Sequence, residues 1–90
     1  MDANDYEKER DLLKQLGNKE IRAFRRFYKE YSDDLLILAY MLLESNTKAI
    51  KAVDDLFERL WLEAKFEYIE PPIHKFLVSE LHKACISKIS

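Results

Sequence analysis

The sequence predicts an all-α domain, a compact bundle of four to five helices. First, the chain of 90 residues contains one glycine and two prolines, whereas β-sandwiches and barrels need many tight turns made from such residues. Second, apolar residues recur at alternating spacings of three and four over most of the chain, which places them on one face of a helix. We expect one domain over residues 1–90, because this length suits a single hydrophobic core.

The N-terminal segment predicts a short amphipathic helix over residues 5–16. Gly17 follows it and is the expected C-cap, since glycine ends helices at little conformational cost. Asn18 is the expected N-cap of the next helix, because its side-chain oxygen can accept a backbone N–H.

The next apolar stripe predicts helical structure over residues 19–44. The stripe keeps its register throughout, but a polar run with capping chemistry interrupts it at residues 32–34. Two interpretations stay open: helices 19–31 and 33–44 joined by a bend, or one continuous helix.

Two further helices complete the expected bundle. A polar break at residues 45–47 has capping chemistry and precedes a helix over residues 47–64. Residues 66–72 form a loop, in which Pro72 suits the first turn of the last helix. That helix reaches Ser90 without a stop signal, so we expect the natural chain to continue.

The composition favours a folded protein. With 48% hydrophobic and 36% charged residues, the chain has enough apolar surface for a core and is not typical of disorder. The acidic, polar N-terminus does not resemble a signal peptide, and no apolar run approaches the roughly 20 residues of a membrane span. We therefore expect a cytoplasmic protein without membrane contact.

The charges fall into patches of alternating sign. The formal net charge of −2 predicts no general affinity for nucleic acid. Basic residues gather between positions 19 and 29, acidic residues between 54 and 70, and the last stretch is mildly basic again.

The residue patterns of catalysis and metal binding are missing, so we expect no enzyme, no cofactor and no metal site. With Gly17 as the sole glycine, a glycine-rich phosphate loop is excluded. His74 and His82 lack acidic neighbours at ligand spacing and are expected on the surface. Cys85 lies in the apolar stripe of the last helix and is expected in the core.

Two groups of residues are candidates for binding. Asp54 and Asp55 each pair with Glu58 at helical spacing, and a convex acidic patch without a cleft suits binding better than catalysis. Phe66 and Tyr68 stand in the loop between charges. They either pack beneath the loop or stack on nucleic-acid bases.

Three segments, in order along the chain, carry a family resemblance. AFRRFYKEYSDDLLILAYMLL begins at residue 23, AIKAVDDLFERLW at residue 49 and FLVSELHKACISKI at residue 76. From about residue 10 to residue 90, the chain resembles the second conserved region of extracytoplasmic-function (ECF) bacterial sigma factors, and is similar to their Bacteroidetes-type members.

The resemblance implies a sigma-factor region 2-like fold and a role in transcription initiation. Such a domain binds the β′ clamp coiled coil of core RNA polymerase and helps recognise the promoter −10 element as a melted non-template strand. The resemblance places Asp54, Asp55 and Glu58 against the clamp, and Leu56 either lies near them or, as we expect, packs inside. It assigns promoter DNA contacts to Phe66, Tyr68, Lys75, Lys83 and Lys88.

An alternative remains open. The sequence lacks the helix-turn-helix domain with which this family reads the −35 element, and Glu67 and Glu70 in the loop repel phosphate. The bundle could instead be a protein-interaction module that holds an anti-sigma factor or another regulator, or dimerises, and has lost the DNA-reading role.

Overall fold

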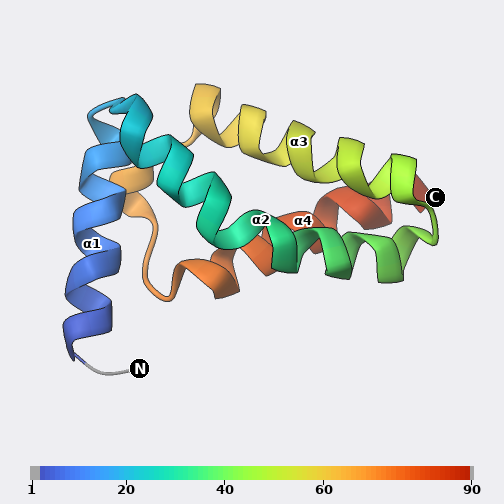
Figure 1. Ribbon diagram of the computed structural model, residues 1–90, viewed down its shortest axis with the longest axis horizontal. Helices are drawn as coiled ribbons and strands as arrows, with labels where there is room; N and C mark the ends of the chain where they lie inside the picture. The colour runs from blue at the N-terminus through green and yellow to red at the C-terminus, as the bar shows by residue number, and fades with distance from the viewer. Residues whose placement is uncertain (1–2, 90) are drawn as a thin grey trace.

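The fold consists of helices, as the sequence predicts, and no strand occurs in the part of the chain that the structure describes. The computed structural model describes residues 3–89, and the side chains of residues 4–86. The elements are α1 (Ala3–Gly17), α2 (Ile21–Leu43), α3 (Asn46–Glu63), the short 3₁₀ helix η1 (Phe66–Tyr68) and α4 (Ile73–Ile89) (Figure 1).

α2, α3 and α4 lie along the long axis of the molecule, and α1 crosses one end (Figure 1). In Figure 1, α2 runs in front of α4 with α3 beside them, and α1 stands across the end where α2 begins. The principal extents are 36 × 27 × 20 Å. The loop after α3 returns to α1, so η1 packs against α1. No described helix is both long and apolar enough to cross a bilayer.

α2 is one continuous helix, the second of the two interpretations left open by its sequence. It changes direction near its middle (Figure 1). The polar run does not break it, because only Ser32 faces the core, whereas Asp33 and Asp34 are exposed.

The connection between α1 and α2 differs from the prediction. Asn18 is not the N-cap of α2: Glu20 holds that position, and its side chain makes no capping hydrogen bond. The left-handed residue is Lys19, with φ of 61°, rather than Gly17. The turn is closed by backbone groups, since the Lys19 N–H donates to the Leu16 carbonyl at 3.0 Å. Asn18 lies within this backbone-bonded turn, two residues before the N-cap position, and so does not cap α2.

The break between α2 and α3 matches the prediction. The Ser45 hydroxyl oxygen accepts a hydrogen bond from the Lys48 N–H at 3.3 Å and caps α3. Glu44 ends α2 in the left-handed conformation, with φ of 54°, and its N–H donates to the Tyr40 carbonyl at 2.8 Å.

Aromatic rings form the centre of the core. The buried ring of Phe27 contacts Phe57 at 5.2 Å and Tyr31 at 5.7 Å between centroids, in edge-to-face geometry. Such aromatic pairs stabilise the core beyond the contribution of the area that they bury. Cys85 is buried, as its place in the apolar stripe predicts.

Candidate functional site

The outer face of α3 carries three carboxylates. Asp54, Asp55 and Glu58 are all exposed, while Leu56 is buried. The α-helical period explains this separation, because residues four apart share a face whereas Leu56 points with Val53 into the core. The expected packing of Leu56 is confirmed, and burial of one face of α3 fixes the outward direction of the carboxylates.

A tyrosine of the neighbouring helix holds one of these carboxylates. The Tyr28 hydroxyl donates a hydrogen bond to Asp54 Oδ1 at 3.0 Å, and its ring packs edge-on against Phe57. Desolvation of the ring, together with the hydrogen bond and charge of Asp54 and the charge of Asp33, raises the pKa of Tyr28. The hydroxyl therefore stays protonated, and so remains a donor, to a higher pH than an ordinary tyrosine. No spacing pattern in the sequence indicates this contact, because it joins residues 26 positions apart.

The second carboxylate has a weak local partner. Lys51 Nζ lies 3.3 Å from Asp55 Oδ2, one helical turn away, and both side chains are well exposed. Exposed pairs of this kind contribute little free energy, so a binding partner can displace Lys51 at small cost.

Exposed apolar residues lie at both ends of the acidic face. Ile50 precedes Asp54 by four residues, and Leu62 follows Glu58 by four. Since residues four apart are neighbours on a helix, the face is acidic at its centre and apolar at its ends. This surface suits a partner with basic residues between apolar ones.

The two loop aromatics have opposite positions. Phe66 is 1% exposed and its ring packs edge-on against Phe27, so the packing alternative is confirmed for it. The DNA contact that the resemblance assigned to Phe66 is corrected, because a base cannot stack on a ring that η1 turns into the core. Tyr68 is 76% exposed and stays available to a ligand.

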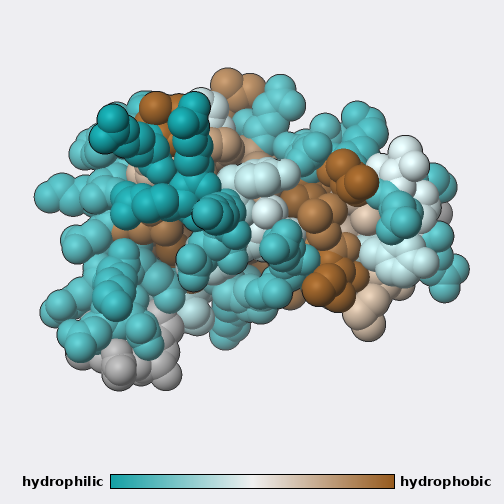
Figure 2. Space-filling view, in the orientation of Figure 1, coloured by the Kyte–Doolittle hydropathy of each residue, from teal (hydrophilic) through white to brown (hydrophobic). Residues whose placement is uncertain are grey.

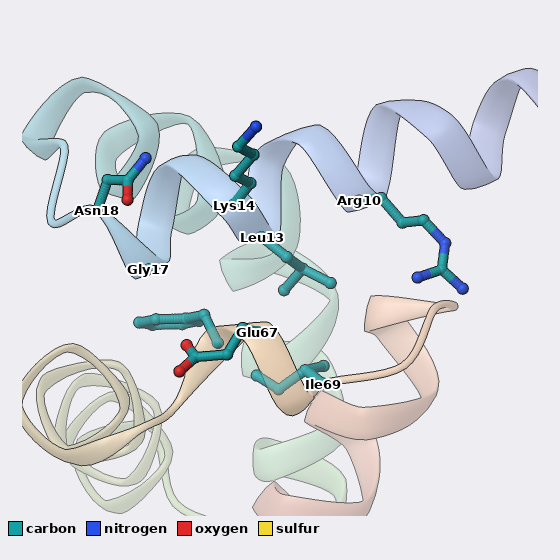
Figure 3. Close-up of a pocket in the computed structure, with 8 residues that line it drawn as sticks. Arg10, Leu13, Lys14, Gly17, Asn18, Glu67 and Ile69 are labelled. Carbon is teal, nitrogen blue, oxygen red and sulfur yellow. The ribbon is translucent and has the colours of Figure 1, made fainter.

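A pocket of about 380 Å³ lies between α1 and η1 (Figure 3). Leu13 and Ile69 contribute apolar surface, and the charged side chains come from both elements. In Figure 3, Arg10 and Glu67 approach the pocket from opposite sides. The lining residues are Arg10, Leu13, Lys14, Gly17, Asn18, Phe66, Glu67 and Ile69.

A second hollow lies on the α4 side of the same loop. It measures about 340 Å³, and Tyr68 and Phe76 contribute aromatic surface to it. Arg59 and Lys65 bring positive charge, with Glu63 and Glu80 also in the lining. The exposed aromatic ring of Tyr68 thus lies beside two cationic and two acidic groups, so the ring could stack on a base but the charges around it do not favour a phosphate.

The lysines of α4 are the remaining candidates for DNA contact. Lys75 and Lys83 are exposed, and Lys83 Nζ lies 3.5 Å from a carboxylate oxygen of Glu80. The side chain of Lys88 lies outside those that the structure describes. Both histidines, His74 and His82, are on the surface, as expected. Among the described residues, no group of His, Cys, Asp or Glu side chains has the arrangement of a metal site.

No protein-family model, curated protein or solved structure matches this chain. The two surfaces, acidic on α3 and aromatic with neighbours of both charge signs around Tyr68, are therefore the basis for assigning a function.

Proposed function

We propose that this chain is the polymerase-binding domain of an ECF-type sigma factor, and that the acidic face of α3 docks on the β′ clamp coiled coil. The observation that carries the proposal is the set of three exposed carboxylates on a helix whose opposite face is buried in the core. The order and spacing of the three family-like segments support it.

The physics of the proposed contact is electrostatic complementarity. Asp54, Asp55 and Glu58 would meet basic residues of the clamp, which speeds association and fixes the register of the two partners. Tyr28 holds Asp54 in place before binding, so less side-chain entropy is lost on docking. Contacts between exposed charges weaken as salt screens them.

The test is a calorimetric titration of the chain against the isolated clamp helices at about 50 mM and about 200 mM salt. We expect binding that weakens with salt, and its loss in the variant Asp54→Lys/Asp55→Lys/Glu58→Lys. A matched variant, Glu7→Lys/Asp11→Lys/Glu20→Lys, makes the same charge change on exposed residues elsewhere and should still bind. If the α3 variant and the wild type bind with equal affinity, the acidic face of α3 is not the contact with the clamp.

The second part of the proposal concerns promoter DNA. In the holoenzyme, the melted −10 strand would follow η1 and α4, with a base against Tyr68 and phosphates near Lys75 and Lys83. The net charge of −2 predicts weak binding by the isolated domain, because few phosphate contacts are available to release counterions.

Holoenzyme carrying Tyr68→Ala tests this part. We expect binding of the melted strand to weaken by about 1–3 kcal/mol, the usual value of one stacked base. Tyr6→Ala, at an exposed tyrosine on α1, is the control and should have no effect. If Tyr68→Ala binds the melted strand as tightly as the wild type does, the loop is not part of the DNA site.

A second candidate function is a protein-interaction module without a DNA role, which holds an anti-sigma factor or another regulator, or dimerises. The burial of Phe66 favours it, since only one of the two expected base-stacking rings is accessible. Self-association that is insensitive to salt in sedimentation, together with no binding to polymerase or DNA, would support this candidate over the first.

A further inference from the structure

A group of exposed apolar side chains lies on the C-terminal half of α2. Ile37, Tyr40 and Met41 are 62%, 49% and 69% exposed. They are three and four residues apart and so share one face of the helix. Figure 2 shows hydrophobic surface over this half of α2. We call these three residues the α2 patch; an exposed apolar group on one helix face, unlike a single exposed side chain, is a candidate interaction surface.

The charged residues around the α2 patch are acidic. Asp33 and Asp34 lie one helical turn before it, and Glu44 lies one turn after it, all exposed. We call these three residues the acidic rim. No lysine or arginine occurs in the sequence from Glu30 to Thr47, so the rim has no basic residue within its own segment.

This charge distribution discriminates among candidate occupants. Phospholipid surfaces and nucleic acids carry negative charge, which the acidic rim repels. A second copy, paired antiparallel patch to patch, would bring Asp34 of one chain toward Glu44 of the other, and like charges disfavour such a pairing. An amphipathic helix with basic residues beside its apolar stripe is complementary to the patch in apolar spacing and to the rim in charge.

We propose that the α2 patch binds an amphipathic helix of a partner protein. Its apolar side chains, three and four residues apart, pack on the patch, and its lysines or arginines face the acidic rim. The inference stands apart from the proposed polymerase contact, because that contact uses α3 and this one uses α2.

The test titrates the full chain with a blocked synthetic peptide of about 18 residues, or five helical turns. The peptide carries leucines on one face and lysines at both ends of that face. We expect NMR shift changes at residues 33–44, and an affinity at least about tenfold weaker for Ile37→Asp. The control Ile86→Asp alters an equally apolar, half-exposed position on α4 and should bind within about twofold of wild type. A peptide with glutamate in place of lysine should not bind.

Four results would overturn the proposal. If Ile37→Asp and the wild type bind the peptide with equal affinity, the α2 patch is not part of the contact. If the glutamate peptide binds as tightly as the lysine peptide, the acidic rim does not contribute to binding. Shift changes confined to the outer face of α3 would place the peptide on the other surface. A mass that doubles with concentration, and that Ile37→Asp returns to the monomer, would instead assign the patch to a second copy of the chain.

Discussion

At the scale of single residues, the loop after α3 separates two aromatic side chains that are only two positions apart. Phe66 begins η1 and points inward, where it meets the ring of Phe27 at 6.1 Å. Tyr68 ends η1 and points to solvent. One turn of 3₁₀ helix therefore gives one ring to the core and the other to the surface, so the two should respond differently to truncation.

We expect Phe66→Ala to lower the free energy of unfolding by roughly 3–5 kcal/mol, because it leaves a cavity in the core. Tyr68→Ala should change the same quantity by about 0.5 kcal/mol or less, as is usual for exposed positions. Urea denaturation followed by circular dichroism measures both. Equal stability of the two variants would contradict the burial of Phe66.

At the scale of elements, the helix ends contain non-glycine residues in the left-handed conformation, which glycine adopts more easily. Glu44 ends α2 with φ of 54°, a conformation that costs an L-residue with a Cβ atom about 1–2 kcal/mol and costs glycine little. The conformation persists because its N–H bonds to the carbonyl of Tyr40 and the chain must turn into α3.

Replacing Glu44 by glycine should therefore stabilise the protein. We expect a gain of about 0.5–1 kcal/mol, reduced from the full backbone term because glycine also makes the unfolded chain more flexible. The thermal midpoint measures it. Glu44→Ala is the control, since it removes the same charge but keeps a Cβ atom, and it should give no comparable gain. A midpoint for Glu44→Gly at or below that of Glu44→Ala would rule out backbone strain at this cap.

The elements also show what the sequence could and could not predict. Apolar periodicity predicted all four helices and the outward direction of Asp54, Asp55 and Glu58, because a helix repeats the same geometry along its length. Where that repetition stops, the sequence was less informative: residue type pointed to Asn18 as the cap of α2, where backbone bonds close the turn instead, and the loop pattern could not decide whether Phe66 packs inside or stacks on a base. Contacts between distant segments, such as that of Tyr28 with Asp54, leave no trace in spacing.

At the scale of the whole molecule, α1 contacts the beginning of the last helix, α4. Glu9 Oε1 accepts a hydrogen bond from the N–H of Ile73, the first residue of α4, at 2.5 Å. A carboxylate at this position satisfies a free N–H and faces the positive end of the helix dipole. Leu13 and Leu16, on the same helix, are buried, so α1 holds the loop and the start of α4 against the rest of the bundle.

Glu9→Ala should lower the free energy of unfolding by about 1.5–3 kcal/mol, the range for a hydrogen bond to a charged acceptor. Glu7→Ala, an exposed position on the same helix, controls for the change in helix propensity and charge. Amide exchange adds a local readout, since the N–H of Ile73 should exchange faster in Glu9→Ala alone. Unchanged exchange at Ile73 would show that Glu9 does not cap α4.

Burial of Tyr31 links the fold to pH, with a smaller contribution from the charge of Glu9. Burial of the ring, followed by the charges of Glu9 and Glu30, raises the pKa of Tyr31 from 10.0 to about 12. The folded protein thus keeps a proton that the unfolded chain releases near pH 10. The resulting stabilisation is complete below pH 10 and is lost as pH rises through the folded value of about 12.

We therefore expect the wild type to lose more stability than Tyr31→Phe when urea denaturation at pH 9 is compared with denaturation near pH 12. The difference should be on the order of 1–2 kcal/mol, since solvent partly screens a half-buried ring. Comparing the two proteins at each pH cancels the titration of groups that they share. Tyr28→Phe should act in the same direction, because the pKa of Tyr28 is also raised. Parallel pH profiles for the wild type and Tyr31→Phe would contradict the raised pKa, and with it the burial of the Tyr31 ring that is its main cause.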